Sequence, residues 1–344
     1  MINWHSCTGI ILGIAFTVLA SACGLSRNGA ETQPLPTGSG AYPVTITNYD
    51  YVENPIDFTY HKTPAKVVVI HPGATELLLD LGLESRIVAT IAPYGKPVAQ
   101  VAEKYARLNI LKAPYMPAEE ELLELQPDMI IGWAHQFSPT GIGQVKAWQN
   151  RNVGTYILPS TLLKSKPTLE TMVYSNIADI GRIFNIQPVT GPYIEKLKNR
   201  VTKIQASLQG VTRKKTVLVL QDHFNGTFSL YDSQHVISHM IELAGGINLC
   251  ENRASFVGAE KVLAFDPDFI IFVSVNKRNF AEDLSDEEAV ASLQAVTELR
   301  GLRAIQTGNI INLPFFTVNN AGIRTIDGIE KIATRLYPDK FNRP

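Results

Sequence analysis

Aromatic, histidine and arginine residues follow the apolar runs that predict the strands of this chain. These runs include VVVI at 67–70, DMIIGW at 128–133, KTVLVL at 215–220 and FIIFVSV at 269–275. Ligands of open α/β sheets bind beyond the carboxyl ends of the strands, so the residues that follow each run are candidates for a binding cleft. The candidates are His71, Tyr94, Trp133, His135, Phe137, His223, Phe224, Tyr231, Arg278, Phe315 and Phe316.

This set combines large aromatic faces with modest positive charge. Aromatic rings supply contact area, while arginine and histidine side chains fix the orientation of a charged group. The cluster as a whole therefore predicts a cleft for a large, flat or polycyclic ligand that carries some negative charge.

Two segments repeat one pattern, EELLELQPDMII at 120–131 and EKVLAFDPDFII at 260–271. Each begins with a glutamate, has a leucine three residues later and Pro-Asp seven and eight residues later, and ends in an apolar strand. A helix, a turn and a strand explain the leucine, the proline and the isoleucines. Glu120 and Glu260 would lie in first helical turns, where the helix dipole favours a carboxylate. The repetition predicts two similar lobes.

The elements that position these residues alternate between strands and amphipathic segments, which predicts an α/β fold with a mainly parallel sheet in each lobe. Further strands are expected at 86–91, 153–158 and 304–313. The expected helices of the first lobe are 74–81, 98–106, 117–125 and 143–150, and those of the second lobe are 234–244, 259–265, 286–293 and 320–337.

A long helical region separates the two sets, first at 168–185 and then at 192–208. Apolar residues recur at helical spacing from Ile194 to Leu208. Pro192 suits the first turn of this second helix and Gly210 its end. A helix of this length spans about 25 Å, which suits a stiff link between two lobes, although an ordinary core helix has the same apolar stripe.

The first residues have the features of an export signal. An apolar run from Ile10 to Ala22 ends in small residues and is followed by Cys23. The run is short for a permanent membrane span, which takes about 20 apolar residues, and it predicts a secretory leader. LASAC at 19–23 resembles a bacterial lipobox, in which Cys23 receives lipid, but Ala-Ser-Ala also fits ordinary leader cleavage.

The domain organisation follows from these signals. We expect a signal peptide at 1–22, a lipid-attachment cysteine and flexible tether at 23–40, an N-terminal α/β lobe at 41–166, a helical connector at 167–210 and a C-terminal α/β lobe at 211–344.

The net charge and the absence of certain motifs argue against two classes of function. The 31 basic and 32 acidic residues give a formal net charge of −1, so no global field attracts nucleic acid. The sequence lacks G-x-S-x-G, H-E-x-x-H, a P-loop and G-x-G-x-x-G, which argues against an enzyme. A zinc or manganese receptor remains an alternative, since His235 and His239 stand four residues apart on one helical face.

From Tyr42 to its end the chain resembles the ABC-importer binding proteins for iron–siderophore complexes, haem and vitamin B12. The resemblance rests on YPVTITN at 42–48, KVVV at 66–69, TEL at 75–77, LGL at 81–83, both Pro-Asp segments and IELAGG at 241–246.

That resemblance implies two Rossmann-like lobes joined by one long helix, in an exported monomer that a lipid on Cys23 anchors to the membrane. Glu120 and Glu260 would dock on a permease dimer, which works with cytoplasmic ATPase subunits. The solute would be an iron–siderophore complex, with a corrinoid or haem as alternatives. The chain would need no cofactor of its own, because iron or cobalt would enter only within the solute.

Overall fold

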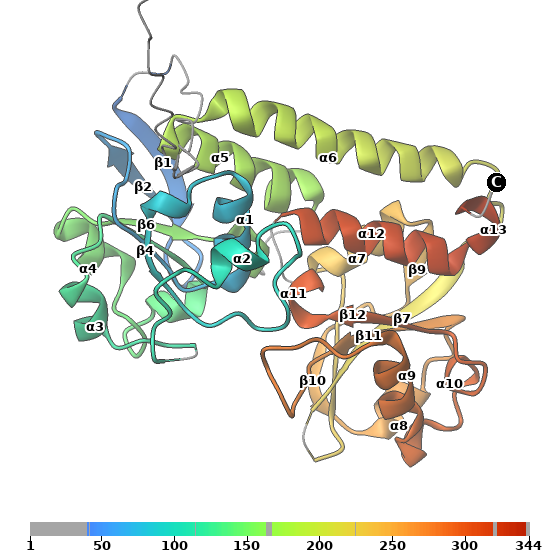
Figure 1. The fold of residues 1–344 in the computed structure, drawn as a ribbon. Coiled ribbons are helices and arrows are strands. Elements are labelled where there is room, and N and C mark those ends of the chain that lie inside the picture. Colours follow the sequence, from blue (N-terminus) through green and yellow to red (C-terminus); the bar gives the residue numbers. More distant parts are fainter. Residues whose placement is uncertain are drawn as a thin grey trace, which may run out of the picture. The chain divides into compact units, whose positions relative to one another are not determined.

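The computed structural model describes residues 40, 42–113, 115–162, 167–223, 225–318 and 322–341. The expected leader, Cys23 and Phe224 lie outside these residues, as does the expected tether except Gly40. The described residues belong to one compact unit. In the described part we call the elements from β1 to β6 the N-terminal lobe and those from β7 to α13 the C-terminal lobe (Figure 1).

The N-terminal lobe is built on a four-stranded parallel sheet in the order β4-β3-β5-β6. Its strands are β3 (Val67–Val69), β4 (Ile87–Thr90), β5 (Met129–Gly132) and β6 (Gly154–Ile157). Val67 and Val69 face one core cluster and Val68 faces another. Because both faces of the sheet are buried, its strands are continuous apolar runs rather than alternating ones.

An antiparallel hairpin of β1 (Val44–Tyr49) and β2 (Pro55–Tyr60) adjoins this sheet. The buried side chain of Asn48 accepts a hydrogen bond from the backbone amide of Ile157 (2.7 Å) and donates one to its carbonyl (3.0 Å). One asparagine therefore joins the hairpin to the edge strand β6.

The C-terminal lobe has a six-stranded mixed sheet in the order β10-β8-β7-β11-β12, with β9 also paired to β7. Strands β7 (Lys215–Asp222), β9 (Gly246–Asn248), β11 (Phe269–Ser274) and β12 (Ile310–Pro314) are parallel. Strand β8 (Phe228–Leu230) runs antiparallel to β7, and β10 (Ala254–Val257) runs antiparallel to β8.

The mixed sheet differs from the strands expected from the sequence at two places. Phe228 begins an additional strand, β8, because β7 extends to Asp222 and pairs with it. The expected strand at 304–313 begins only at Ile310, since α10 (Arg303–Gln306) and a turn occupy its first part.

Most of the expected helices are present, within a few residues of their expected ends. The expected helix at 98–106 is reduced to four residues, and Phe315 and Phe316 begin a short helix. The helices of the N-terminal lobe are α1 (Pro72–Asp80), α2 (Ala102–Tyr105), α3 (Glu119–Glu124) and α4 (Val145–Asn150). Those of the C-terminal lobe are α7 (Val236–Leu243), α8 (Ala259–Leu263), α9 (Asp286–Gln294), α10, α11 (Phe315–Val318), α12 (Ile323–Leu336) and α13 (Pro338–Phe341).

The repeated aspartate has the same structural role in each lobe. The Asp128 carboxylate accepts hydrogen bonds from the backbone amides of Ala65 and Lys66, at 2.8 and 2.9 Å, just before β3. The Asp268 carboxylate accepts from the amide and hydroxyl of Thr216 in β7, at 3.0 and 3.1 Å. Each aspartate therefore holds the start of its own strand against the neighbouring parallel strand.

Two consecutive helices connect the lobes: α5 (Ser175–Phe184), which a π-helical turn at Glu170–Tyr174 precedes, and α6 (Gln187–Ser207). Helix α6 packs against α5 and against α12 of the C-terminal lobe (Figure 1). Its 21 residues span about 32 Å. Pro192 is not in its first turn as expected, because the helix begins earlier, at Gln187, with Pro188 in the first turn.

Three clusters of buried apolar side chains fill the interior of the described residues. The largest includes residues of both sheets together with α5, α6, α7 and α12. The other two lie on the opposite face of each sheet. The expected α/β architecture, with two lobes and one long connecting helix, is thus confirmed, while the lobe boundaries stay predictions. In the described ranges no helix is both long and apolar enough to span a bilayer.

Candidate functional site

A cavity of about 360 Å³ is lined by both lobes. The N-terminal lobe contributes residues after β5 and β6, and the C-terminal lobe contributes residues of β7, β8, β10 and the loops beside them. This is the position expected for a ligand site of parallel sheets. The lining residues are Trp133, His135, Ser160, Thr161, Leu162 and Pro167 on one side, and Gln221, Ser229, Leu230, Tyr231, Gln234, His235, Val236, Arg253, Ser255 and Phe315 on the other.

Trp133 and Phe315 form the aromatic part of the lining. Their rings lie 6.3 Å apart and nearly parallel, at 26°. Behind them, His71 contacts Trp133 at 4.6 Å and Phe316 at 5.6 Å between ring centres. Tyr94 lies 5.4 Å from Phe316. Of the predicted residues, Trp133 and Phe315 therefore line the cavity, while His71, Tyr94 and Phe316 pack behind that layer.

His71 is a structural residue at the start of α1. Its Nδ1 accepts a hydrogen bond from the backbone amide of Ala74 at 3.2 Å, and the side chain is fully buried. Burial lowers the pKa of His71 to about 3, so the ring is neutral at physiological pH. Because this imidazole is neutral, buried and engaged in capping α1, it supports Trp133 rather than binding a ligand directly.

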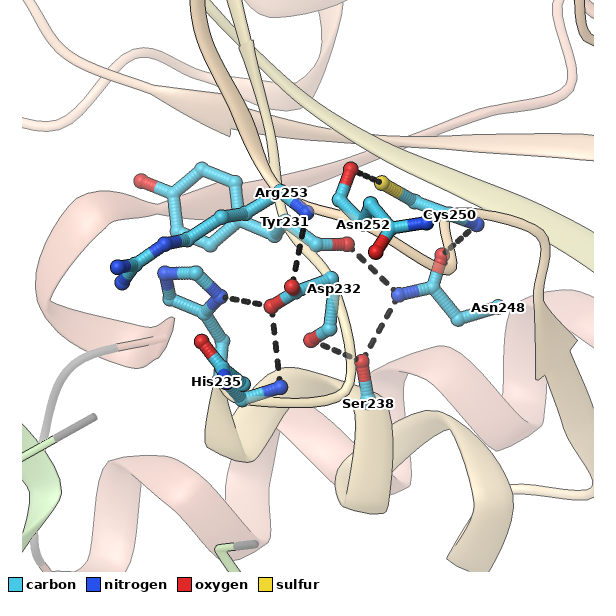
Figure 2. A network of polar contacts seen from close by, with 9 residues as sticks. Tyr231, Asp232, His235, Ser238, Asn248, Cys250, Asn252 and Arg253 are labelled. Carbon is cyan, nitrogen blue, oxygen red and sulfur yellow. Dashed lines mark hydrogen bonds and ion pairs between the residues drawn. The ribbon is translucent and has the colours of Figure 1, made fainter. Parts of the chain in front are cut away.

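The polar part of the lining is organised by Asp232, whose residue is 4% exposed. Its Oδ1 accepts from the backbone amide of Gln234 and from Nδ1 of His235, both at 3.0 Å. Its Oδ2 accepts from the backbone amide of Arg253 at 2.8 Å. Figure 2 shows these bonds together, with the side chains of His235 and Arg253 on the same side of the carboxylate.

These contacts determine the protonation states of Asp232 and His235. Burial alone would raise the pKa of Asp232, but the amides of Arg253 and Gln234 and the ring of His235 outweigh it and hold the pKa below its ordinary value. Burial lowers the pKa of His235, although Asp232 acts in the opposite direction. A neutral His235 that donates from Nδ1 leaves Nε2 as an acceptor. Among the lining residues that the structure describes, Arg253 is therefore the one fixed cation, and it lies beside a neutral imidazole.

Other contacts hold the remaining predicted lining residues. The Tyr231 hydroxyl donates to Oε1 of Gln221 at 2.7 Å, and its ring lies 4.7 Å from that of His235. His135 stacks on Tyr115 at 5.5 Å and is hydrogen-bonded to its hydroxyl. Burial lowers the pKa of His135 as well.

Besides His71, Tyr94 and Phe316, three more of the predicted residues do not line this cavity. Phe137 is 0% exposed and belongs to the second core of the N-terminal lobe, so it offers no surface to a ligand. His223 contacts the Ser229 hydroxyl at 2.7 Å and the ring of Phe256 at 4.6 Å. Arg278 is exposed in the loop after β11.

Arg253, Gln221 and His235 are lining residues that the sequence analysis did not assign to the cleft. Arg253 immediately precedes the short strand β10, which has no apolar run to mark it. The sequence predicts His235 only as a metal ligand paired with His239. The structure separates the two, because His235 bonds Asp232 while Nδ1 of His239 accepts from the Leu169 amide at 3.1 Å. No group of three or more metal-binding side chains occurs among the residues described.

A buried ion pair joins the lobes beside the site. Arg324 of α12 donates from Nε and Nη2 to the two carboxylate oxygens of Glu76 in α1, both at 2.6 Å. Arg324 also donates to the Lys96 carbonyl, and the Gly95 amide donates to the Phe280 carbonyl at 2.7 Å. The loop at 94–98 is thus fixed to the C-terminal lobe.

The glutamates of the repeated motif lie at corresponding positions. Glu120 is in the first turn of α3 and Glu260 in the first turn of α8, and both residues are exposed. Neither forms an ion pair with another residue in the described ranges.

Comparisons with known proteins agree with this geometry. The family model described as "Periplasmic binding protein" matches residues 67–315. A Bacillus subtilis (strain 168) protein named as the uncharacterized ABC transporter substrate-binding lipoprotein YvrC is 24% identical over 330 residues, covering 94% of this chain and 95% of the relative.

Solved structures share the fold. A periplasmic binding protein from Veillonella parvula superposes with a TM-score of 0.74 at 22% identity, over 87% of this chain and 99% of that one. An ABC-type Fe3+-hydroxamate transport protein from Saccharomonospora viridis gives a TM-score of 0.71 at 19% identity, over 88% and 100% of the two chains. A haem-binding protein, HutB of Vibrio cholerae, gives 0.62 at 20% identity, over 79% and 99%.

Proposed function

Because this chain belongs to the periplasmic binding protein family, we propose that it is the solute receptor of an ABC importer and that it captures an iron–siderophore complex in the cavity between its lobes. The members of this family and the relatives compared are binding proteins, not enzymes. The proposed role ends with delivery of the solute to a membrane permease.

The lining of the cavity carries this proposal. A volume of about 360 Å³ lies within the range of small-molecule sites. Trp133 and Phe315 offer flat faces for a chelating ring system, and Arg253 offers a charge-assisted hydrogen bond to an anionic oxygen. Ferric chelates of hydroxamate or catecholate type present such oxygens around a bulky, partly apolar body.

The related solutes remain alternatives for the same role. The Saccharomonospora neighbour is described as part of an Fe3+-hydroxamate system and the Vibrio neighbour as a haem-binding protein. A corrinoid would use the same aromatic faces. A bare zinc or manganese ion is disfavoured, because His71, His235 and His239 each have a different structural partner.

A fluorescence titration tests the solute class. The chain without its expected leader keeps two tryptophans, Trp133 in the cavity lining and Trp148 in the core. We expect ferric hydroxamate or catecholate chelates to quench emission saturably, and Trp133→Phe to remove that response. Arg253→Ala should weaken binding by about 10- to 100-fold, because it removes a charge-assisted hydrogen bond.

The same titration with cyanocobalamin, haem and Zn²⁺ separates the alternatives. Saturable quenching by one of these, with none by ferric chelates, contradicts the siderophore assignment and retains the receptor role. Arg278→Ala is the matched control, since this arginine is exposed and does not line the cavity.

We further propose that Glu120 and Glu260 dock the loaded receptor on the two permease subunits. Exposed ion pairs contribute less than about 1 kcal/mol each but orient an encounter. The double variant Glu120→Arg/Glu260→Arg should lose transport in cells while binding the chelate as tightly as wild type. Unchanged uptake would remove the docking role.

We also propose that Cys23 carries lipid and holds the receptor at the membrane. This residue lies outside the described part of the chain. Mass spectrometry of the mature amino terminus should find a diacylated cysteine, and Cys23→Ser should release the protein from membranes. An unmodified amino terminus would indicate ordinary leader cleavage.

A further inference from the structure

Helices α3 and α8 each expose a leucine on the face that carries the docking glutamate. Leu123 is 38% exposed and Leu263 is 42% exposed. Each lies three residues after its glutamate, Glu120 or Glu260, and residues three apart share one face of a helix. An acid and a large apolar side chain therefore stand together on the surface of both lobes.

The inward faces of the two helices match as well. Leu122 and Val262, one position before each leucine, are 0% exposed and belong to the cores of their own lobes. These buried anchors fix the rotation of each short helix. Leu123 and Leu263 therefore point outward. The same order of buried and exposed positions continues through both Pro-Asp turns.

We propose that Leu123 and Leu263 are a pair of apolar contacts for the permease, one for each of its two subunits. This inference rests on the proposed docking of Glu120 and Glu260. The glutamates orient the encounter, whereas burial of an exposed leucine supplies affinity that surface ion pairs lack. A contact repeated once per lobe suits a partner that presents two like surfaces.

The charge around the leucines argues against self-association through the same surface. Four of the six residues of α3 are glutamates, and Glu260 stands on the outward face of α8. If a second copy covered these patches, acidic side chains would face each other, which is unfavourable. A partner with basic groups around an apolar pocket fits both features.

Photo-crosslinking from the full chain in the cells that make it identifies the partner. A benzophenone amino acid replaces Leu123 or Leu263, and mass spectrometry identifies the crosslinked protein. We expect both positions to yield a permease subunit with several membrane spans. The control position is Ile247 of β9, which is 46% exposed and lies outside both helices, and it should yield none.

Affinity for that purified permease–ATPase complex, reconstituted in nanodiscs, then measures the contribution of each leucine. Leu123→Ser and Leu263→Ser should each weaken the Kd by about tenfold and the double variant by more, as expected for contacts at the centre of an interface. Ile247→Ser should leave the Kd unchanged. Thermal unfolding of each variant verifies that its fold is intact.

The outcomes separate this inference from the docking proposal on which it rests. If the leucine variants bind as wild type while Glu120→Arg/Glu260→Arg does not, the leucine contacts are refuted and docking stands. If neither set changes the Kd, both proposals fail. If the leucine substitutions instead dissociate a dimer of the purified receptor in sedimentation, a second copy covers the patches and the inference is overturned.

Discussion

At the scale of single residues, Asp232 determines the polar half of the cavity. Its two oxygens accept three hydrogen bonds, from the amides of Gln234 and Arg253 and from the ring of His235. The carboxylate thereby connects the loop before α7 to the start of β10, two segments that both line the cavity. Asp232 is a positioning residue whose effect on a solute would pass through its neighbours.

Asp232→Asn is expected to destabilise the protein in a pH-dependent way. The pKa of Asp232 lies below its ordinary value of 3.8, so the stabilisation from its ionised form is complete above that value and is lost as pH falls through the lower folded pKa. The variant should be about 1–2 kcal/mol less stable at pH 7, with the difference shrinking below pH 4. Urea unfolding at several pH values measures this.

A pH-independent difference would mean that the network acts by shape rather than by charge. Asp266→Asn is the matched control, since this aspartate is exposed and pairs with Arg303, which is also exposed, at 3.4 Å.

Some of the cavity residues could be predicted from the sequence and others could not. Trp133 and Phe315 follow apolar strands, so their place at the cavity was predictable. Phe137 also follows a strand, but a 3-10 turn at Ala134–Phe137 directs it into the core. Arg253 was not predicted because it precedes β10, a strand of only four residues whose place depends on pairing with β8, a contact between segments distant in sequence.

At the scale of elements, α6 contains a proline where an interior residue should donate a hydrogen bond. Pro192 is the sixth residue of this helix, beyond the first turn. A proline inside a helix removes the bond to the carbonyl four residues earlier and crowds that turn. The long connector therefore forms despite Pro192, held by its packing on α5 and α12.

Pro192→Ala is expected to stabilise the protein by about 1–2 kcal/mol, the gain from a restored helical bond less the entropy that alanine adds to the unfolded chain. Chemical denaturation measures it. Pro188→Ala is the control, because a first-turn proline costs the helix nothing. A loss of stability in Pro192→Ala would indicate that the ring itself packs usefully.

The element pattern was the part best predicted from sequence. Apolar runs predicted the parallel strands other than β9, and the two Pro-Asp segments predicted the duplication. Strands β8 and β10 were not predicted, because a serine interrupts each of these short apolar segments, FSL at 228–230 and ASFV at 254–257.

At the scale of the whole molecule, Glu76 and Arg324 form a buried polar link between the lobes. Their side chains are 8% and 11% exposed, and the guanidinium binds both carboxylate oxygens. Removing one member of such a pair leaves an uncompensated buried charge, whereas removing both does not.

Arg324→Met should lower the free energy of unfolding by about 3–5 kcal/mol, and Glu76→Leu/Arg324→Met should recover much of that loss. Urea denaturation of both single variants and the double variant forms the required cycle. The exposed pair of Arg107 and Glu103 serves as the control, for which the same cycle should give less than about 1 kcal/mol. Additive losses at 76 and 324 would contradict a direct coupling.

The path of the chain has a consequence for how the two halves stay together. They are linked covalently through α5 and α6, yet α6 lies against α12, one apolar cluster includes both sheets, and Arg324 binds Glu76. A protease cut in the exposed turn after α6, near Gln209 and Gly210, would leave these contacts intact. If the chain is divided there and both fragments are produced in the same cell, they should associate into a functioning receptor.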